Sequence, residues 1–341
     1  MFIRNCWYVA AFGDEVSNRP LGRRILGEDL VLFRPSNGVV AALEDRCCHR
    51  GLPLSLGELN GDLIRCHYHG LEYDCTGKCV FIPGQKAIPS AARVRSYPIC
   101  ERGRAIWIWM GNPEKADVSA IPAFPWFEDP GWAWKGKPFP IKCNYEMLND
   151  NLLDLSHLAY VHRRTLGGDP EVHFNAQMET THTERNVKVI RRMPDCEPPP
   201  TYTRMVELKG HVDRWQEIEF FPGLITLYSG GVDAGTGAYE GRREGGFQLR
   251  LFDAVTPESE TSTLNLFCCG HNFRVNDPEV TNLLFAEFEN VLGEDIRVLE
   301  AQQSRLENSA NHSFVNLSVD APGILARRLL AAMSARETPT G

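Results

Sequence analysis

The sequence predicts an α+β protein, in which an all-β N-terminal domain precedes an α+β domain with an antiparallel sheet flanked by helices. Short apolar segments separated by turn residues fill the first third of the chain, and this spacing is typical of an all-β domain. Later segments are longer and include two helix candidates. A proline-rich stretch, residues 111–132, separates the two parts. The predicted domains are residues 1–118 and 119–341.

The N-terminal domain is predicted from its strand-forming segments and from the turns that join them. Gly27-Glu28 and Thr76-Gly77 are turn signals, so each pair is expected to close a hairpin. The bulky run at 105–110 favours a strand. The expected strands cover residues 2–10, 22–26, 29–34, 39–43, 63–65, 71–74, 79–81, 94–99 and 105–110.

The second domain is predicted to contain both strands and helices. Apolar residues at helical spacing indicate a helix from Tyr145 to His157. Asp277 is a suitable N-cap and Pro278 suits the first helical position, so a long last helix is expected from there to about Leu306. The expected strands lie within residues 178–192, 202–208, 215–229 and 247–268.

Composition and charge exclude several classes of protein. The chain has 341 residues and a net charge of −8, which argues against a nucleic-acid-binding surface. It contains neither a long apolar run nor a signal-peptide pattern, so we expect no membrane span and a cytoplasmic location. The 11 cysteines therefore do not indicate a disulfide scaffold.

A first metal site is indicated by two short motifs, C-C-H-R-G and C-H-Y-H-G. They pair Cys47 with His49 and Cys66 with His69, and a glycine follows each histidine closely. Two thiols and two imidazoles in this frame suit a [2Fe–2S] cluster in which one iron has two Cys ligands and the other two His. Structural zinc is the alternative, but zinc sites of this composition normally place both Cys before both His.

A second metal site is indicated by the sequence N-D-N-L-L-D-L-S-H-L-A-Y-V-H. Asn151, Asp154 and His157 recur every third residue and would share one face of a helix. His162 lies five positions after His157, a spacing at which a regular helix cannot point both rings at one ion. We therefore expect the helix to end or widen between Leu158 and Val161.

Two histidines require a third ligand if they hold non-haem iron(II), and a carboxylate completes the usual triad. Asp295 lies on the apolar stripe of the last helix, where an acid is costly unless it is paired or bound to metal. Asp295 is therefore the predicted third ligand. Glu294 and Glu300 are its competitors on the wetter flanks of that helix.

Together these motifs resemble those of the Rieske non-haem iron oxygenases, over nearly the whole chain. The similarity is strongest to the oxygenase components of vanillate O-demethylase and dicamba monooxygenase, and toluenesulfonate-type methyl hydroxylases are also similar. The resemblance implies an N-terminal Rieske domain and a catalytic domain with mononuclear iron. It also implies a head-to-tail homotrimer in which Asp154 links His157 to His69 of the neighbouring subunit, and it places Asn151 near the iron. The family often has proline where this chain has Cys48.

The function that the resemblance implies is O-demethylation of a methoxylated aromatic acid by O2, which yields a phenol and formaldehyde. Electrons would come from NAD(P)H through a flavin- or ferredoxin-type reductase, since the chain has no flavin motif of its own. Hydroxylation of a methyl group or of a ring is the alternative activity. A Rieske electron carrier with a binding domain is the non-enzyme alternative. The sequence offers four candidate anchors for a substrate carboxylate: Tyr202, Arg204, His211 and Arg250.

Overall fold

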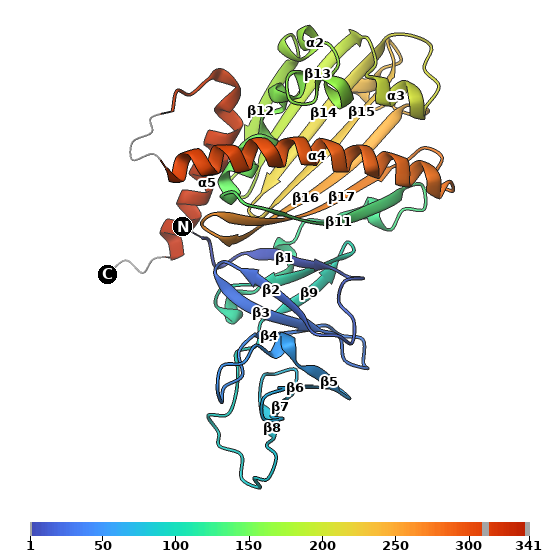
Figure 1. The fold of residues 1–341 in the computed structure, drawn as a ribbon. Helices are drawn as coiled ribbons and strands as arrows, with labels where there is room; N and C mark the ends of the chain where they lie inside the picture. Colours follow the sequence, from blue (N-terminus) through green and yellow to red (C-terminus); the bar gives the residue numbers. More distant parts are fainter. Residues whose placement is uncertain (1, 309–313, 338–341) are drawn as a thin grey trace. The chain divides into compact units, whose positions relative to one another are not determined.

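The computed structural model describes residues 2–308 and 314–337, which divide into two compact units (Figure 1). The first unit is Met1–Ala123 together with Thr256–Ser259, and the second is Phe124–Val255 together with Glu260–Gly341. The first unit thus ends slightly beyond residue 118 and also takes in a short separate segment. The domain limits expected from the sequence stay a prediction. Within the described ranges, no helix is long and apolar enough to cross a bilayer.

The first unit consists of three small antiparallel sheets. One has the order β1-β10-β9, formed by β1 (Trp7–Phe12), β9 (Ile99–Arg102) and β10 (Ala105–Trp109). The second is β2 (Leu21–Ile25), β3 (Glu28–Phe33) and β4 (Ala41–Glu44). The third is β5 (Glu58–Asn60), β6 (Leu63–Arg65), β7 (Glu72–Tyr73) and β8 (Cys79–Phe81). Short 3₁₀ helices cover Leu54–Leu56, Pro113–Lys115 and Val118–Ala120.

Two expected features of this unit differ from the structure. The turn between β2 and β3 is Leu26-Gly27 rather than Gly27-Glu28, and both residues have positive φ, 51° and 80°. This pair of left-handed residues matches the twist of a two-residue hairpin. The strand expected at 94–99 is wrong except at its last residue, because Pro98 has no N–H with which to continue a ladder.

The second unit is built on one antiparallel sheet of seven strands, in the order β11-β17-β16-β15-β14-β13-β12. Three of the expected segments each turn out to be a hairpin of two strands. The strands are β11 (Ala133–Ile141), β12 (Gln177–His182), β13 (Val187–Cys196), β14 (Val212–Phe221), β15 (Leu224–Asp233), β16 (Phe247–Ser259) and β17 (Ser262–His271). The strand expected at 202–208 is wrong, because Pro200 opens a short helix there, as proline favours the first helical position.

The helices of the second unit are α1 (Tyr145–Leu153), α2 (Pro170–Phe174), α3 (Pro200–Met205), α4 (Pro278–Glu307) and α5 (Ala321–Glu337). Short 3₁₀ helices cover Pro125–Phe127, Leu155–Ala159, Ala238–Glu240 and Ser318–Asp320, and a π-helix covers Arg163–Gly167. Figure 1 shows α4 crossing one face of the large sheet. Asp277 caps α4 as predicted, accepting a hydrogen bond from the N–H of Glu279 at 3.1 Å.

The apolar face of α4 anchors that helix to the sheet. Phe285 is buried in a cluster with Leu284, Phe288 and Phe267 of β17. We expect Phe285→Ala to lower the free energy of unfolding by about 3–5 kcal/mol, because it removes a buried ring and leaves a cavity. Urea unfolding followed by circular dichroism measures this loss. Leu283→Ala is the control, since Leu283 is 56% exposed on the same helix; an equal loss in both variants would contradict the packing described.

Candidate functional site

The two cysteine–histidine motifs of the first unit form two loops with the same backbone geometry. Gly51 donates its N–H to the carbonyl of Cys47 at 2.9 Å, and Gly70 donates to the carbonyl of Cys66 at 2.9 Å. Both glycines have positive φ, 75° and 72°, which other residues adopt only with strain. Each loop is therefore closed immediately after its histidine.

In these loops the cysteine side chains point inward and the histidine side chains lie at the surface. Cys47 and Cys66 are buried, whereas His49 and His69 are exposed and their ring centroids lie 4.5 Å apart. A cluster between the loops would thus have its sulfur-ligated iron inside and its nitrogen-ligated iron at the surface. The four residues fit a [2Fe–2S] group with two Cys and two His ligands.

Tyr73 of β7 is a functional candidate that the sequence-based prediction missed. Its hydroxyl lies 3.1 Å from Sγ of Cys47 and 3.2 Å from Sγ of Cys48. Burial, reinforced by the two thiols, raises the pKa of Tyr73 well above its usual range. The phenol therefore stays protonated and can donate a hydrogen bond to a thiolate of the cluster. No motif in the sequence marks this residue, because only the pairing of β7 with β6 brings it there.

The loop that carries the second histidine pair begins where α1 ends. α1 stops at Leu153, earlier than the expected end at His157. The carboxylate of Asp154 accepts hydrogen bonds from the N–H of Ser156 at 2.8 Å and from its hydroxyl at 3.0 Å. This local capping competes with helix continuation and starts the 3₁₀ helix Leu155–Ala159.

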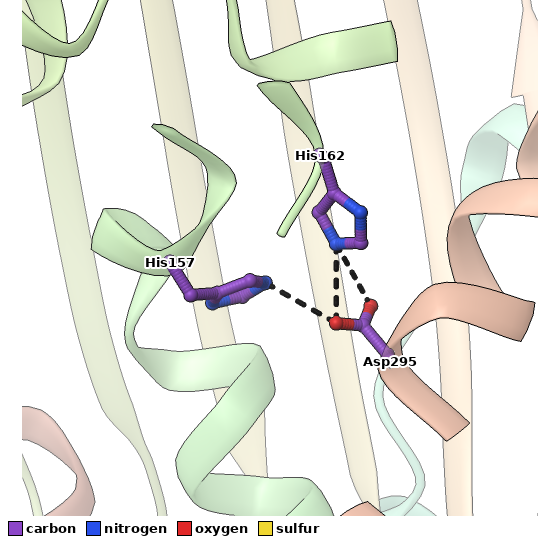
Figure 2. A group of neighbouring side chains, drawn as sticks. All are labelled: His157, His162 and Asp295. Atoms are coloured by element: carbon purple, nitrogen blue, oxygen red, sulfur yellow. Dashed lines mark hydrogen bonds and ion pairs between the residues drawn. The ribbon is translucent and has the colours of Figure 1, made fainter. Parts of the chain in front are cut away.

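The structure brings His157, His162 and Asp295 together (Figure 2). Their ligand atoms all lie within 4.8 Å of one another. Nε2 of His162 is 3.1 Å from the Asp295 carboxylate, and Nε2 of His157 is 3.5 Å from it. Because the chain leaves the regular α-helix after Leu153, the rings of His157 and His162 both point toward Asp295 despite their five-residue spacing. Asp295 is only 6% exposed, so its carboxylate is poorly hydrated and the group suits a metal ion.

The other ring nitrogen of each histidine is also engaged. Nδ1 of His157 lies 2.5 Å from the backbone oxygen of Asp154, and Nδ1 of His162 lies 2.7 Å from the carboxylate of Glu294. These contacts fix the rings with Nε2 toward Asp295. Asn151 donates from Nδ2 to the Asp295 carboxylate at 3.1 Å and so holds the third group.

The competitors of Asp295 occupy other positions. Glu294 contacts the far side of the His162 ring instead of joining the group. Glu300 accepts a hydrogen bond from the backbone N–H of Lys142 at 3.0 Å. Within the chain, Asp154 contacts the His157 ring through its backbone oxygen, and its carboxylate caps Ser156.

The two histidines differ in basicity. Burial lowers the pKa of His157, which keeps this ring neutral. For His162, burial is outweighed by its hydrogen bonds to Asp295 and Glu294, which raise its pKa. A neutral imidazole is the form that binds a metal ion, so a bound cation would displace any proton on His162.

A cavity in the second unit adjoins the triad. Its walls are mainly apolar and come from the segment after α1, from α4 and from the facing strands of the sheet. The apolar lining includes Leu152, Leu155, Leu158, Leu166, Ile225, Leu227, Leu249, Leu251, Phe267, Phe288, Val291 and Leu292. The polar lining other than the triad is Asn151, Tyr202, Arg214, Gln216, Ser229 and Asp253. Burial raises the pKa of Asp253 to about 7.

Of the four expected carboxylate anchors, only Tyr202 lines this cavity. Arg204 is largely exposed and pairs with Glu287 at 2.7 Å. His211 lies at the surface beside Asp195. Arg250 packs among aromatic rings on another part of the sheet, and its guanidinium carbon lies 3.4 Å from the centre of the Tyr228 ring. Arg214, which the sequence-based prediction did not single out, lines the cavity instead.

Comparison with known proteins gives consistent matches along the chain. Residues 6–98 match the Rieske [2Fe-2S] domain family, and residues 141–336 match the vanillate O-demethylase oxygenase C-terminal domain family. The toluene-4-sulfonate monooxygenase system iron-sulfur subunit of Comamonas testosteroni is 38% identical over 94% of both chains. The vanillate O-demethylase oxygenase subunit of Pseudomonas sp. (strain HR199 / DSM 7063) is 36% identical over 99% of this chain and 96% of that one. A crystal structure of dicamba monooxygenase bound to 3,6-dichlorosalicylic acid superposes with a TM-score of 0.92, at 34% identity over 98% of each chain.

Proposed function

Because the chain belongs to the vanillate O-demethylase group of Rieske non-haem iron oxygenases, we propose that it O-demethylates a methoxylated aromatic acid. The family, the fold class and the enzyme class predicted from the sequence are confirmed. So are the two cofactors, since the chain carries a Rieske domain and the matched dicamba monooxygenase is described with non-haem iron. The substrate, the site residues and the partners belong to the proposal.

The proposed cluster ligands are Cys47, His49, Cys66 and His69. The observation that supports them is the pair of matching loops with buried thiols and adjacent outward rings. The proposed iron ligands are His157, His162 and Asp295, supported by ligand atoms that lie within 4.8 Å of one another. When bound at these residues, the cluster would supply single electrons and the iron would supply the chemistry that activates O2.

The residues around the triad position the reacting groups. The backbone oxygen of Asp154 and the carboxylate of Glu294 hold the two imidazoles, and Asn151 holds Asp295. The leucine-rich walls of the cavity exclude water and favour a flat aromatic ring over a hydrated polar compound. Insertion of one oxygen atom of O2 into a methoxy C–H bond, with two electrons from the reductase and two protons reducing the other atom to water, would leave a hemiacetal, which collapses to a phenol and formaldehyde.

The proposed partners follow from the same family. The names of the relatives describe a subunit of a monooxygenase system and an oxygenase subunit, so each works within a larger system. For this chain we propose an NAD(P)H-dependent reductase that carries a flavin or ferredoxin-type centre. We also propose a head-to-tail homotrimer, in which Asp154 connects His157 to His69 of the neighbouring subunit.

Hydroxylation of a methyl group attached directly to the ring is the second candidate function. It is supported by the 38% identity to the toluene-4-sulfonate monooxygenase subunit, which equals the identity to the dicamba O-demethylase oxygenase component. A pure electron carrier is disfavoured, because such a protein has no need of a buried two-histidine, one-carboxylate group next to a cavity.

Product analysis of the holoenzyme with a reductase and NADH separates these functions. With methoxylated benzoates we expect one formaldehyde and one phenol for each O2 consumed. With methyl-substituted benzoates or benzenesulfonates, the second candidate would instead give a benzyl alcohol without formaldehyde. Formation of neither product from either panel, with both metal centres loaded, would contradict the proposed function.

A further inference from the structure

The cavity beside the triad contains a buried positive charge that the chain itself does not neutralise. Arg214 on β14 is 2% exposed and lines the cavity. Its Nε has no hydrogen-bond partner, and none of the carboxylates in the described ranges forms an ion pair with it. Burying a cation without an anion is costly, so natural proteins rarely keep one unless something else supplies the partner.

Arg191, the other buried arginine of the described part of this sheet, shows what a satisfied side chain looks like. Arg191 is 5% exposed, but its guanidinium donates to the carbonyl oxygens of Leu155 and His173 and to the side-chain oxygen of Gln216. Arg250 is half-buried among aromatic rings outside the cavity, and its Nε also has no hydrogen-bond partner. Arg191 therefore has protein partners that account for its burial, and Arg250 has the faces of several rings.

The contacts of Arg214 do not account for its charge in the same way. Its guanidinium lies 5.4 Å from the centre of the Tyr202 ring and is close enough to the Cys196 thiol to lower the pKa of that thiol. A ring face and a neutral thiol are weak partners compared with a carboxylate. Burial raises the pKa of Cys196, so this thiol stays protonated and carries no negative charge.

A glycine opposite Arg214 lets the Tyr202 ring and the Arg214 stem pack closely on the sheet at this end of the cavity. On β15 the residue paired with Arg214 is Gly231, and a Cβ there would lie 3.0 Å from the Tyr202 ring and 3.4 Å from Arg214. The neighbouring pair on the same face is Gln216 with Ser229, and both also line the cavity. The sheet side of the cavity thus ends in a polar row, whereas the triad comes from the helical segments opposite.

We propose that Arg214 binds the anionic group of the substrate, a carboxylate or a sulfonate, and selects anionic aromatic compounds over neutral ones. The planar guanidinium can bind two oxygens of such a group at once. Gln216 and Ser229 add hydrogen-bond donors on the same face, and the apolar walls hold the ring with its other end toward the triad. This inference rests on the proposed function, since it concerns the substrate of the same site.

Binding in the absence of a reductase tests the proposal without turnover. The full-length holoprotein is titrated calorimetrically with 4-methoxybenzoate, 4-methoxybenzenesulfonate and the neutral 4-methoxybenzamide. We expect the wild type to bind one or both anions at least about 10-fold more tightly than the amide. In Arg214→Met the affinity for the anions should fall by about 100-fold, while that for the amide changes by less than about 3-fold.

Matched variants separate a binding role from a structural one. Arg250→Met removes a half-buried arginine of the same sheet that lies outside the cavity, and it should leave all three affinities unchanged. Arg214→Gln keeps hydrogen-bond donors without the charge, and it replaces Arg214→Met if the latter does not fold. Retained preference for the anions in the folded Arg214 variant, or an equal loss in Arg250→Met, overturns the proposal.

The affinities of the wild type test the proposal without any variant. If the wild type binds the two anions and the amide equally tightly, the proposal is overturned. Arg214-dependent binding of anions that release no formaldehyde in the complete system would support the anion site and contradict O-demethylation. Formaldehyde release with no dependence of binding on Arg214 would do the reverse. The two proposals therefore fail separately.

Discussion

Asp295→Ala is expected to reduce turnover to below about 1% of the wild type, because a metal site that loses its carboxylate loses several kcal/mol of catalytic stabilisation. Removing the carboxylate takes away the one group that both His157 and His162 face. It also leaves Nδ2 of Asn151 without its acceptor. The cluster loops lie in the other unit, so their visible spectrum should be unchanged.

Iron content, electron paramagnetic resonance and product formation together measure this effect. The variant should lose the mononuclear iron and keep the two irons of the cluster. Glu300→Gln is the control on the same helix, because Glu300 contacts the backbone of Lys142 rather than the triad. Turnover by Asp295→Ala at the wild-type rate would rule out the proposed iron ligands.

Asp154→Asn is expected to keep both metal centres but to slow electron transfer to the catalytic site by about 10- to 100-fold, a range typical of residues that support metal ligands. The backbone oxygen that contacts His157 is unaffected by this change. The asparagine oxygen can still cap Ser156, so the local fold should persist. What is lost is the negative charge that would accept a hydrogen bond from His69 of the neighbouring subunit.

Rapid-mixing absorbance with substrate present follows the reoxidation of the cluster and measures this rate. Ser156→Ala is the matched control, since it removes the hydroxyl bonded to Asp154 but leaves the carboxylate charged. We expect the control to reoxidise at close to the wild-type rate. If Asp154→Asn also does so, the proposed connection between subunits is wrong.

The features that could be predicted from the sequence are those with a local chemical cause. The spacing of cysteines and histidines points to a cluster whatever surrounds it, and Asp295 stands out because an acid interrupts an apolar stripe. The start of α4 was predictable because the N-cap and the following proline act within one turn. The hairpins of the large sheet were visible as long alternating segments, although not as separate strands.

The features that could not be predicted depend on tertiary context. β11 contains Pro138 and Pro140, which argue against a strand, yet β11 lies at the edge of the sheet, where missing N–H donors are tolerated. The helix at Tyr145 ends early because a single side chain, Asp154, caps Ser156. Arg214 has no motif, and what distinguishes it is tertiary: it is buried, lines the cavity and has no partner for its Nε.

The first unit is built from two separate stretches of sequence, and this limits which chimaeras of two related proteins can fold. Leu26 and Gly27 donate their N–H groups to the carbonyl oxygens of Pro257 and Glu258 at 2.8 and 2.9 Å, and the hydroxyl of Thr256 donates to Val9 at 2.7 Å. A crossover between two homologous genes near codon 123 would leave the first unit with its Thr256–Ser259 segment inherited from the other parent. Viable chimaeras should therefore carry Thr256–Ser259 from the same parent as the N-terminal segment, so that these four residues are inherited as part of the cluster-bearing unit.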